Sequence, residues 1–480
     1  MPSTKGTLFR GGLTRRQLLG TGFAALALPL AGSQASPVEA SRGHRLRPRP
    51  VEAALYGDAY PATRVWSYGK VLPGPLIRAK QGERLHIEVQ NALAVATTVH
   101  WHGIRLPNAM DGVPGLTQAP IEPGERFTYA FDLPDAGTYW YHPHQGSAEQ
   151  LGRGLYGALI VEEPEPPQVD RELIWILDDW RLDEEAQIVE DFGNWHDRTH
   201  GGRFGNSVTV NGRDPGDVTV RAGERVRLRL INAANARVFM LDFEDHAPLI
   251  VALDGQPVKP HAPKSGRVVL APSQRTDIIL DMSAAPGSRH RVIDAAYERD
   301  RYLLLNLVYG EEAPLRQTSL EPPAMLPANP LPEPDLNATS HYRIAFGGGM
   351  HDPALRRGEI DVESLRAQFR RGEVWRLNGQ ARLAHDGEPL LTLERDRPVR
   401  IELINDTTWD HPIHLHGHSF RVLTLNGEAP AERLWRDTLL MTPGDRAEIA
   451  FVADNPGDWM FHCHIPEHQE SGMMATLRVL

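Results

Sequence analysis

The feature that most constrains the fold is an internal repeat. A ten-residue run that alternates between apolar and polar or charged residues and ends in Asn occurs three times, at residues 82–91, 223–232 and 396–405. A shorter element with Pro first and Arg fourth follows each run, at residues 123–126, 272–275 and 443–446. Repetition of two elements in the same order indicates one structural unit present in three copies.

The repeated runs have the pattern of β-strands. Short apolar or alternating stretches, such as residues 84–89, 127–131, 226–231 and 399–404, are separated by Pro, Gly and Asn, and long amphipathic helical patterns are scarce. Many short strands between turn residues are typical of sandwiches or barrels and not of βαβ units. We therefore expect an all-β fold of three β-sandwich or barrel domains.

Chain length and proline content set the expected domain limits. At 480 residues the chain is too long for one hydrophobic core, and the usual domain size suggests about three domains. Pro-rich segments at residues 163–167 and 321–334 lie between the copies and are typical of linkers. The expected domains are residues 41–165, 166–325 and 326–480.

The first 40 residues have the pattern of a cleaved signal peptide. Residues 14–19 contain paired arginines and precede a short Ala/Gly-rich apolar run at 20–32 and small residues at 33–36. The paired arginines favour the twin-arginine route over an ordinary secretory signal, and the apolar run is too short for a stable membrane span. We expect the twin-arginine machinery to export the folded protein to the periplasm.

Charge and cysteine content narrow the partners. The chain has 51 Lys and Arg against 62 Asp and Glu, and this mildly acidic balance argues against a nucleic-acid or membrane-surface partner. A single cysteine excludes an internal disulfide framework.

Eight histidines fall at four equivalent positions of the first and third copies. They are His100, His102, His142, His144, His414, His416, His462 and His464. Residues i and i+2 of a strand point to the same face, so each His-x-His segment presents two imidazoles to one side. Four such pairs can surround several copper ions with positions left open for O₂, whereas zinc prefers a closed set of four ligands. In the middle copy Leu241 and Phe243 replace the first pair, so we expect no copper ligands there.

Cys463, the only cysteine, lies between two of these histidines. Alternation along a strand directs its thiol to the face opposite the flanking imidazoles. A thiolate, two imidazoles and a distant thioether are the ligands of a blue-copper centre. The candidates that complete this set are His411, His468 and Met473. The segment therefore predicts two metal sites joined by a short stretch of backbone.

Four motifs resemble those of the multicopper oxidases, the laccase-like family. In order they are HWHG at 100–103, WYHPH at 140–144, HPIHLHGH at 411–418 and HCHIPEHQESGM at 462–473. The resemblance covers essentially all of the chain after residue 40. It implies three cupredoxin-like Greek-key domains and four copper ions: one type 1, one type 2 and a type 3 pair, with the last three in a cluster between domains 1 and 3.

The resemblance also implies ligand roles and a reaction. The ligands would be His411, Cys463, His468 and Met473 for type 1 copper, His100 and His414 for type 2, and His102, His142, His144, His416, His462 and His464 for type 3. A bacterial oxidase of this kind oxidises a phenolic or aromatic donor, or a reduced metal ion, one electron at a time and reduces O₂ to water with four electrons.

Two acids match the position of a proton relay in bacterial members of the family. They are Asp111, in a Met-Asp-Gly sequence, and Glu467, which directly precedes His468. Asp111 could instead cap a turn before Gly112, and Glu467 could be a solvated loop charge.

The electron donor is the least constrained part of the prediction. Trp409 and Asp410 precede His411, and the Gly-rich loop 347–352 could edge a donor pocket, but packing and turn formation explain these residues equally well. A cuprous or manganese(II) oxidase therefore stays an alternative. A copper-containing nitrite reductase, which has two domains and lacks the four His pairs, is disfavoured. A copper-binding periplasmic scaffold without turnover is disfavoured because every ligand is present.

Overall fold

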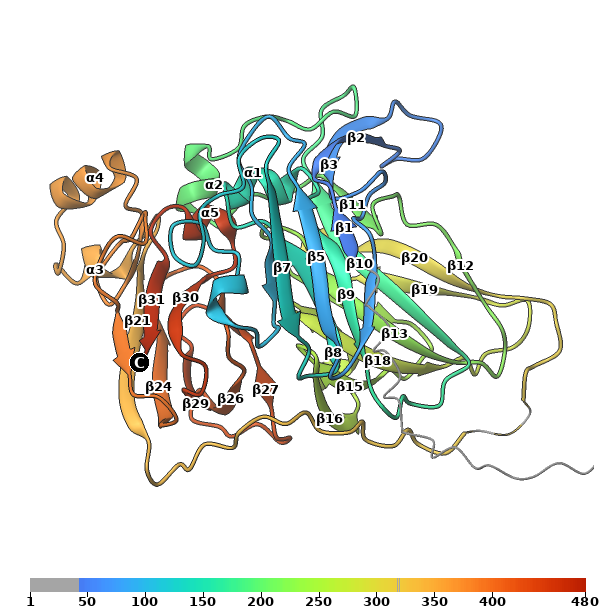
Figure 1. The fold of residues 1–480 in the computed structure, drawn as a ribbon. Helices are drawn as coiled ribbons and strands as arrows, with labels where there is room; N and C mark the ends of the chain where they lie inside the picture. Colours follow the sequence, from blue (N-terminus) through green and yellow to red (C-terminus); the bar gives the residue numbers. More distant parts are fainter. Residues whose placement is uncertain (1–42, 317, 319) are drawn as a thin grey trace, which may run out of the picture. The chain divides into compact units, whose positions relative to one another are not determined.

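β-Strands dominate residues 43–316, 318 and 320–480, which are the residues that the computed structural model describes (Figure 1). The predicted signal peptide lies outside these residues. Within the described part of the chain, no helix is both long enough and apolar enough to cross a membrane.

The first repeat contains three small sheets. In their order across each sheet, the strands are β1 (His44–Leu46), β5 (Arg84–Gln90) and β7 (Arg126–Asp132); β4 (Ile77–Lys80), β9 (Gly157–Glu162), β8 (Gly137–His142) and β6 (His100–His102); and β2 (Arg49–Ala53) with β3 (Thr63–Ser67). In β5, Leu85, Ile87 and Val89 are buried and the residues between them face outward. The alternation predicted from the sequence therefore selects the core face of this strand.

The middle repeat contains a six-stranded and a five-stranded sheet. The first has the order β11 (Ser207–Val210), β10 (Arg171–Trp180), β13 (Arg225–Asn232), β18 (Arg275–Asp281), β15 (Leu249–Leu253) and β16 (Gln256–His261). The second has the order β12 (Val218–Val220), β20 (Tyr302–Tyr309), β19 (Arg289–Asp294), β14 (Phe239–Phe243) and β17 (Val268–Leu270).

The last repeat has the same plan. Its sheets have the orders β22 (Trp375–Leu377), β21 (Ser340–Gly348), β24 (Pro398–Asn405), β29 (Arg446–Val452), β26 (Phe420–Leu425) and β27 (Trp435–Arg436); and β23 (Leu391–Leu393), β31 (Met474–Val479), β30 (Gly457–Cys463), β25 (His411–Leu415) and β28 (Thr438–Met441). The repeated runs β13 and β24 each pair parallel with the preceding long strand and antiparallel with the strand of the second repeated element. The all-β prediction is confirmed.

Short helices connect the strands. They are α1 (Ser147–Gly152), α2 (Trp195–Thr199), α3 (Pro353–Arg356), α4 (Val362–Arg370) and α5 (Pro466–Gln469), with 3₁₀ turns η1 (Asn108–Met110), η2 (Lys264–Gly266) and η3 (Glu298–Asp300). Helix α5 follows β30 directly, and both α1 and α2 contact it (Figure 1). Proline at the first position of α5 fits a helix start because the missing N–H has no intrahelical acceptor there.

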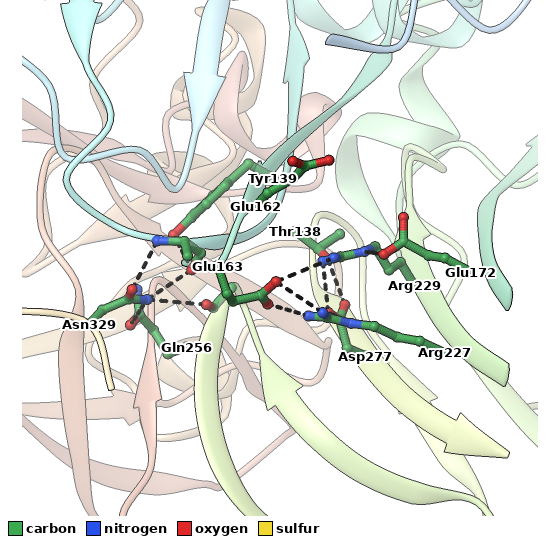
Figure 2. A network of polar contacts seen from close by, with 12 residues as sticks. Thr138, Tyr139, Glu162, Glu163, Glu172, Arg227, Arg229, Gln256, Asp277 and Asn329 are labelled. Atoms are coloured by element: carbon green, nitrogen blue, oxygen red, sulfur yellow. Dashed lines mark hydrogen bonds and ion pairs between the residues drawn. The ribbon is translucent and has the colours of Figure 1, made fainter. Parts of the chain in front are cut away.

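Strand β13 departs from simple alternation, since all of its residues are buried. Arg227 Nη2 lies 2.6 Å from Glu163 Oε1 and 2.7 Å from Asp277 Oδ2 (Figure 2). Arg229 Nη1 donates a hydrogen bond to Thr138 Oγ1 at 2.9 Å. Because Thr138 belongs to β8, this polar network packs the middle repeat against the first, and the arginines are buried in ion pairs.

Apolar residues of the first and last repeats form one continuous core. Trp101 and Tyr139 of the first repeat and Phe461 of the last belong to the same buried cluster. The middle repeat has a core of its own, which includes Leu241 and Phe243. The residues that replace a His pair in the middle repeat thus pack as ordinary core side chains.

Candidate metal centres

Two pairs of antiparallel strands carry the His-x-His segments. In the first repeat β6 pairs with β8, and His100 lies opposite His142. In the last repeat β25 pairs with β30, and His414 lies opposite His462. Strand pairing therefore places two His-x-His segments side by side in each repeat, as the equivalent positions in the sequence predict.

The two repeats bring all eight histidines together. Each of the eight side chains is at most 5% exposed. The His102 and His414 rings stack with centroids 3.8 Å apart, and the His100 and His416 centroids are 4.0 Å apart. Imidazoles of the first and last repeats thus alternate in one buried cluster.

Hydrogen bonds fix which ring nitrogens carry a proton. His100 Nδ1 donates to the Asp111 carbonyl at 2.8 Å, and His414 Nδ1 donates to the Asp437 carbonyl at 2.8 Å. A carbonyl only accepts, so Nδ1 is protonated and Nε2 keeps its lone pair. Both Nε2 atoms are buried without a hydrogen-bond partner. A buried acceptor in this state fits a metal ion.

At two further places in the cluster, the unprotonated ring nitrogens of two histidines face each other. His416 and His462 donate their Nδ1 protons to Asp111 Oδ2 and to the Cys463 carbonyl, at 2.9 and 2.8 Å, and their Nε2 atoms lie 3.0 Å apart. His102 Nε2 donates to Asp437 Oδ1 and His142 Nδ1 donates to the Pro143 carbonyl, each at 3.1 Å, so the unprotonated nitrogens are His102 Nδ1 and His142 Nε2, which lie 3.5 Å apart. Unprotonated nitrogens this close are stabilised by a shared cation, so the donor set fits metal ions at these positions.

Three-ligand groups emerge from this geometry. Ligand atoms lie within 4.8 Å of one another in the groups His100, His414 and His416; His102, His142 and His464; and His144, His416 and His462. Burial, reinforced by neighbouring histidines, lowers the pKa of His144 and His464 well below the usual value. Neutral imidazoles are the form that binds a metal.

Two residues that anchor the cluster, Asp437 and Arg275, were not predicted as part of the site. Asp437 Oδ1 accepts a hydrogen bond from His102 Nε2 at 3.1 Å, so the free nitrogen of His102 is Nδ1. Arg275 of β18 donates to the same carboxylate from Nη1 at 2.8 Å. Neither residue lies in a metal-binding motif, and only the packing of the middle repeat against the last brings them together.

A separate group surrounds the cysteine. Cys463 Sγ lies 3.5 Å from His411 Nδ1 and 3.6 Å from His468 Nδ1. His411 Nε2 donates to Thr407 Oγ1 at 2.9 Å and His468 Nε2 donates to the His200 carbonyl at 2.6 Å. Both Nδ1 atoms therefore present lone pairs to the sulfur side, which is the arrangement of a His₂Cys metal site.

Met473 lies in the loop that returns beside this group. The Cys463 N–H donates to the Met473 carbonyl at 3.1 Å, and the Met473 N–H donates to the His468 carbonyl at 3.0 Å. Met473 is fully buried. Burial also raises the pKa of the Cys463 thiol, so a bound cation is needed to hold it as thiolate.

Asp111 both closes a turn and touches the cluster. Its N–H donates to the Asn108 carbonyl at the end of η1, as the turn interpretation expects. Its carboxylate is 1% exposed, with Oδ1 3.2 Å from His100 Nδ1 and Oδ2 2.9 Å from His416 Nδ1. One side chain therefore holds imidazoles of both repeats.

Glu467 is buried inside α5, so it is not a solvated loop charge. Its Oε1 accepts a hydrogen bond from Asn235 Nδ2 at 3.1 Å, and the same amide donates to the Ala148 carbonyl at 2.9 Å. Burial raises the pKa of Glu467 to about 7. Its part in proton transfer stays a prediction.

The predicted loop at residues 347–352 is β-strand as far as Gly348, and the turn that follows at residues 349–351 lies next to the cysteine group. Trp409 Nε1 donates to the Met350 carbonyl at 3.0 Å, and the Met350 N–H donates to the Thr199 carbonyl at 2.7 Å. The His200 ring, one residue on, contacts the Trp409 ring with centroids 5.1 Å apart. Sequence spacing could not show that residues 195–200 meet this loop.

Comparison with known proteins agrees with this geometry. Residues 52–166, 171–293 and 360–480 each match a family model described as multicopper oxidase. The multicopper oxidase MmcO of Mycobacterium tuberculosis is 31% identical, over 99% of this chain and 98% of that protein.

Two solved structures have the same fold. The multicopper oxidase of Pseudomonas thermotolerans is 35% identical with a TM-score of 0.79, over 91% of this chain and 99% of its own. The laccase-like multicopper oxidase CueO of Ochrobactrum sp., described as active towards lignin model compounds, is 27% identical with a TM-score of 0.76, over 92% of this chain and 98% of its own.

These matches confirm the predicted fold of three cupredoxin-like domains. The histidine and cysteine groups match the type 1, type 2 and binuclear type 3 copper sites of such enzymes. The chain therefore belongs to the multicopper oxidase family, whose members bind copper and couple one-electron oxidation of a donor to the four-electron reduction of O₂ to water.

Proposed function

We propose that the protein is a laccase-like oxidase that accepts single electrons at an edge formed by His200 and Trp409. The observation that carries this proposal is the 2.6 Å hydrogen bond from His468 Nε2 to the His200 carbonyl. His468 is fully buried, whereas His200 and Trp409 are partly exposed. A donor at this edge is one hydrogen bond away from a ligand of the cysteine site.

We propose the ligand roles that the resemblance to the family implies, and the close grouping of these side chains supports them. We assign His411, Cys463, His468 and Met473 to type 1 copper, His100 and His414 to type 2, and His102, His142, His144, His416, His462 and His464 to type 3. Bound there, copper supplies the one-electron oxidation of the donor and the reduction of O₂. The protein contributes hydrogen bonds that fix the tautomers of the histidines other than His144 and His464, and a site buried from bulk water.

Protons for water formation need a route to the cluster. Asp111 is our first candidate because its carboxylate contacts His100 and His416 directly. Glu467 is the second, since it is buried one residue before His468 and one of its oxygens has no hydrogen-bond partner.

The donor class we favour is phenolic or aromatic. The Trp409 ring and the turn at residues 349–351 present an aromatic, partly exposed edge, and the Ochrobactrum relative is described as laccase-like. Oxidation of Cu(I) or Mn(II) in metal homeostasis is the alternative. A copper-binding scaffold without turnover is disfavoured by the complete set of ligands.

Export and domain limits remain part of the proposal. The paired arginines within residues 14–19 support a twin-arginine signal in residues 1–40 and a periplasmic location for the folded protein. We propose domains at residues 41–165, 166–325 and 326–480.

The assignment is tested with copper-loaded protein and a phenolic dye. We expect an intense blue absorption band from the bond between Cys463 and copper, and O₂ consumption that depends on the dye. Cys463→Ser should abolish the band and the consumption while the far-ultraviolet circular dichroism stays that of a folded β protein. A variant that keeps the blue band would refute the site. O₂ uptake measured side by side with a phenol, Cu(I) and Mn(II) then ranks the donors.

A further inference from the structure

A cavity of about 640 Å³ lies beside the histidine cluster. Its wall is formed by the segments after η1 and before α1, the end of α5, and the loop between β22 and β23. Wall residues that matter here are His144, Gln145, His385, Asp386, Glu470 and Met474. His144 belongs to two of the three-ligand groups, so the cavity reaches the cluster itself. A polar cavity of this volume has room for several water molecules.

His385 is a wall residue that lies outside the metal-binding motifs. It is half-buried and belongs to the loop at residues 378–390. This loop is held in place because the Arg382 N–H donates to the Gly472 carbonyl at 3.1 Å. Among the residues that the structure describes, none forms a hydrogen bond with the His385 ring. Its ring nitrogens are therefore available to water in the cavity.

The charged neighbours of His385 include the carboxylate that touches the cluster. Burial has the largest effect and lowers the pKa of His385, and the charge of Asp111 comes next and opposes this shift. Arg382 lowers the pKa further and Asp386 raises it, and the net result is a pKa below the usual value. A histidine of this kind gains and loses a proton readily at mildly acidic to neutral pH.

The two acids of the cavity wall are less suited to carry protons. Glu470 is held in place, since its Oε1 accepts a hydrogen bond from the Ala148 N–H at 3.0 Å. Asp386 is exposed, so its carboxylate is surrounded by solvent. His385 is the wall residue that combines access to the cavity with the electrostatic influence of Asp111.

We propose that His385 is a proton shuttle for O₂ reduction, which takes protons from water in the cavity and passes them to Asp111. The inference rests on the proposed function and extends its proton route from the cluster to solvent. Asp111 is the natural acceptor because its Oδ2 lies 2.9 Å from His416 Nδ1, inside the cluster. The cavity supplies the wet side of the route and the buried carboxylate the dry side.

The proton balance of this route is closed. Reduction of one O₂ to two waters consumes four electrons and four protons. In each transfer a ring nitrogen of His385 binds one proton from water, and the protonated ring then gives one proton to the Asp111 carboxylate. His385 returns to its neutral form and can repeat the transfer. Electron entry at the cysteine site uses none of these steps, so loss of His385 should slow O₂ reduction alone.

The test compares the copper-loaded wild type with His385→Gln, which stays polar but cannot carry a proton. With a phenolic dye, kcat for O₂ uptake should fall about tenfold or more. Bleaching of the blue band by the phenol without O₂ should stay as fast as in the wild type. Added 2-methylimidazole, a proton carrier whose methyl group hinders binding to copper, should restore much of kcat in the variant only. His86→Gln, which removes an exposed histidine of β5, is the matched control and should behave as the wild type.

A double variant tests the acceptor of the proton. If His385 acts through Asp111, His385→Gln/Asp111→Asn should be no slower than Asp111→Asn, because protons can no longer pass the second residue. Losses that multiply in the double variant would overturn the route through Asp111.

The remaining outcomes also decide the matter. An unchanged kcat in His385→Gln overturns the shuttle. A fall that 2-methylimidazole does not restore, or that comes with copper loss or slower bleaching, makes His385 a structural residue and overturns the shuttle too. A wild type that turns over with Cu(I) or Mn(II) but with no phenol refutes the proposed donor class, while the same comparison with the metal ion as donor still decides the role of His385.

Discussion

Arg275 and Asp437 form a two-point ion pair beside the metal cluster, with Nη1–Oδ1 and Nη2–Oδ2 distances of 2.8 and 2.5 Å. Both side chains are at most 1% exposed. Arg275 comes from the middle repeat and Asp437 from the last, and Asp437 Oδ1 also accepts from His102 of the first. The middle repeat has apolar residues at the positions where the other two repeats have His pairs. Through Arg275 it nevertheless holds the Asp437 carboxylate, which orients the His102 imidazole.

Replacing Arg275 should therefore cost stability and copper together. Arg275→Met leaves the Asp437 carboxylate buried without its partner, and breaking a buried pair in this way costs about 3–5 kcal/mol. Urea unfolding of the copper-free protein measures the free energy, and metal analysis after dialysis measures copper retention. Arg289→Met, at an exposed pair with Asp217, should leave the free energy of unfolding close to that of the wild type, because solvent screens the pair. Equal losses in both variants would show that Arg275 has no special role.

Asp111→Asn tests the proton route. Asparagine keeps the shape, and its amide oxygen can still accept from His416 Nδ1, but the ionisable group is gone. If Asp111 relays protons, kcat for O₂ reduction should fall by about 10²–10⁴ with copper content close to wild type. Asp132→Asn, at an exposed pair with Arg84, is the control. Loss of copper in parallel with kcat would instead make Asp111 a positioning residue.

The sequence predicted the parts of this molecule that repeat or alternate. The Gly-Glu-Arg and Asp-Arg runs mark the starts of β5, β13 and β24, because a strand with one core face needs alternating side chains. The His-x-His spacing predicted which imidazoles share a face, since side-chain direction in a strand depends only on the number of residues. Local rules of this kind are readable without knowing the tertiary fold.

Contacts between repeats were not predictable in the same way. Arg227 and Arg229 occupy the outward positions of their strand, yet both are buried because β8 and Glu163 cover them (Figure 2). The acceptor for His468 is a backbone carbonyl at residue 200, and no side-chain pattern marks a carbonyl. Such partners depend on how the repeats pack, which the spacing of residues along the chain does not determine.

Thr407 sets the tautomer of His411. Its hydroxyl donates to Asn405 Oδ1 at 2.7 Å and therefore accepts from His411 Nε2 at 2.9 Å. Thr407→Val keeps the shape but removes the acceptor, and loss of such a partner weakens metal binding by about 10–100-fold. Copper titration followed by the blue band measures the affinity. Thr442→Val, which removes an exposed hydroxyl that bonds Asp445, should leave it unchanged. Wild-type affinity in Thr407→Val would contradict the assigned tautomer.

Asp178 makes stability depend on pH away from the metal sites. Burial, and then the neighbouring charge of Asp179, raise the pKa of Asp178 well above the usual value. An unfolded aspartate ionises near pH 4, whereas the folded one keeps its proton to higher pH, so the free energy of unfolding falls as pH rises through this interval.

Asp178→Asn cannot ionise, and its oxygen can still accept the Asp179 N–H that Asp178 Oδ1 accepts at 2.8 Å. The variant should therefore gain stability relative to wild type as the pH rises from about 4, measured by urea unfolding at a series of pH values. Asp217→Asn should change in the opposite direction, because Asn306 and Arg289 lower the pKa of Asp217. A constant difference between Asp178→Asn and wild type across this range would show that Asp178 ionises normally in the folded protein.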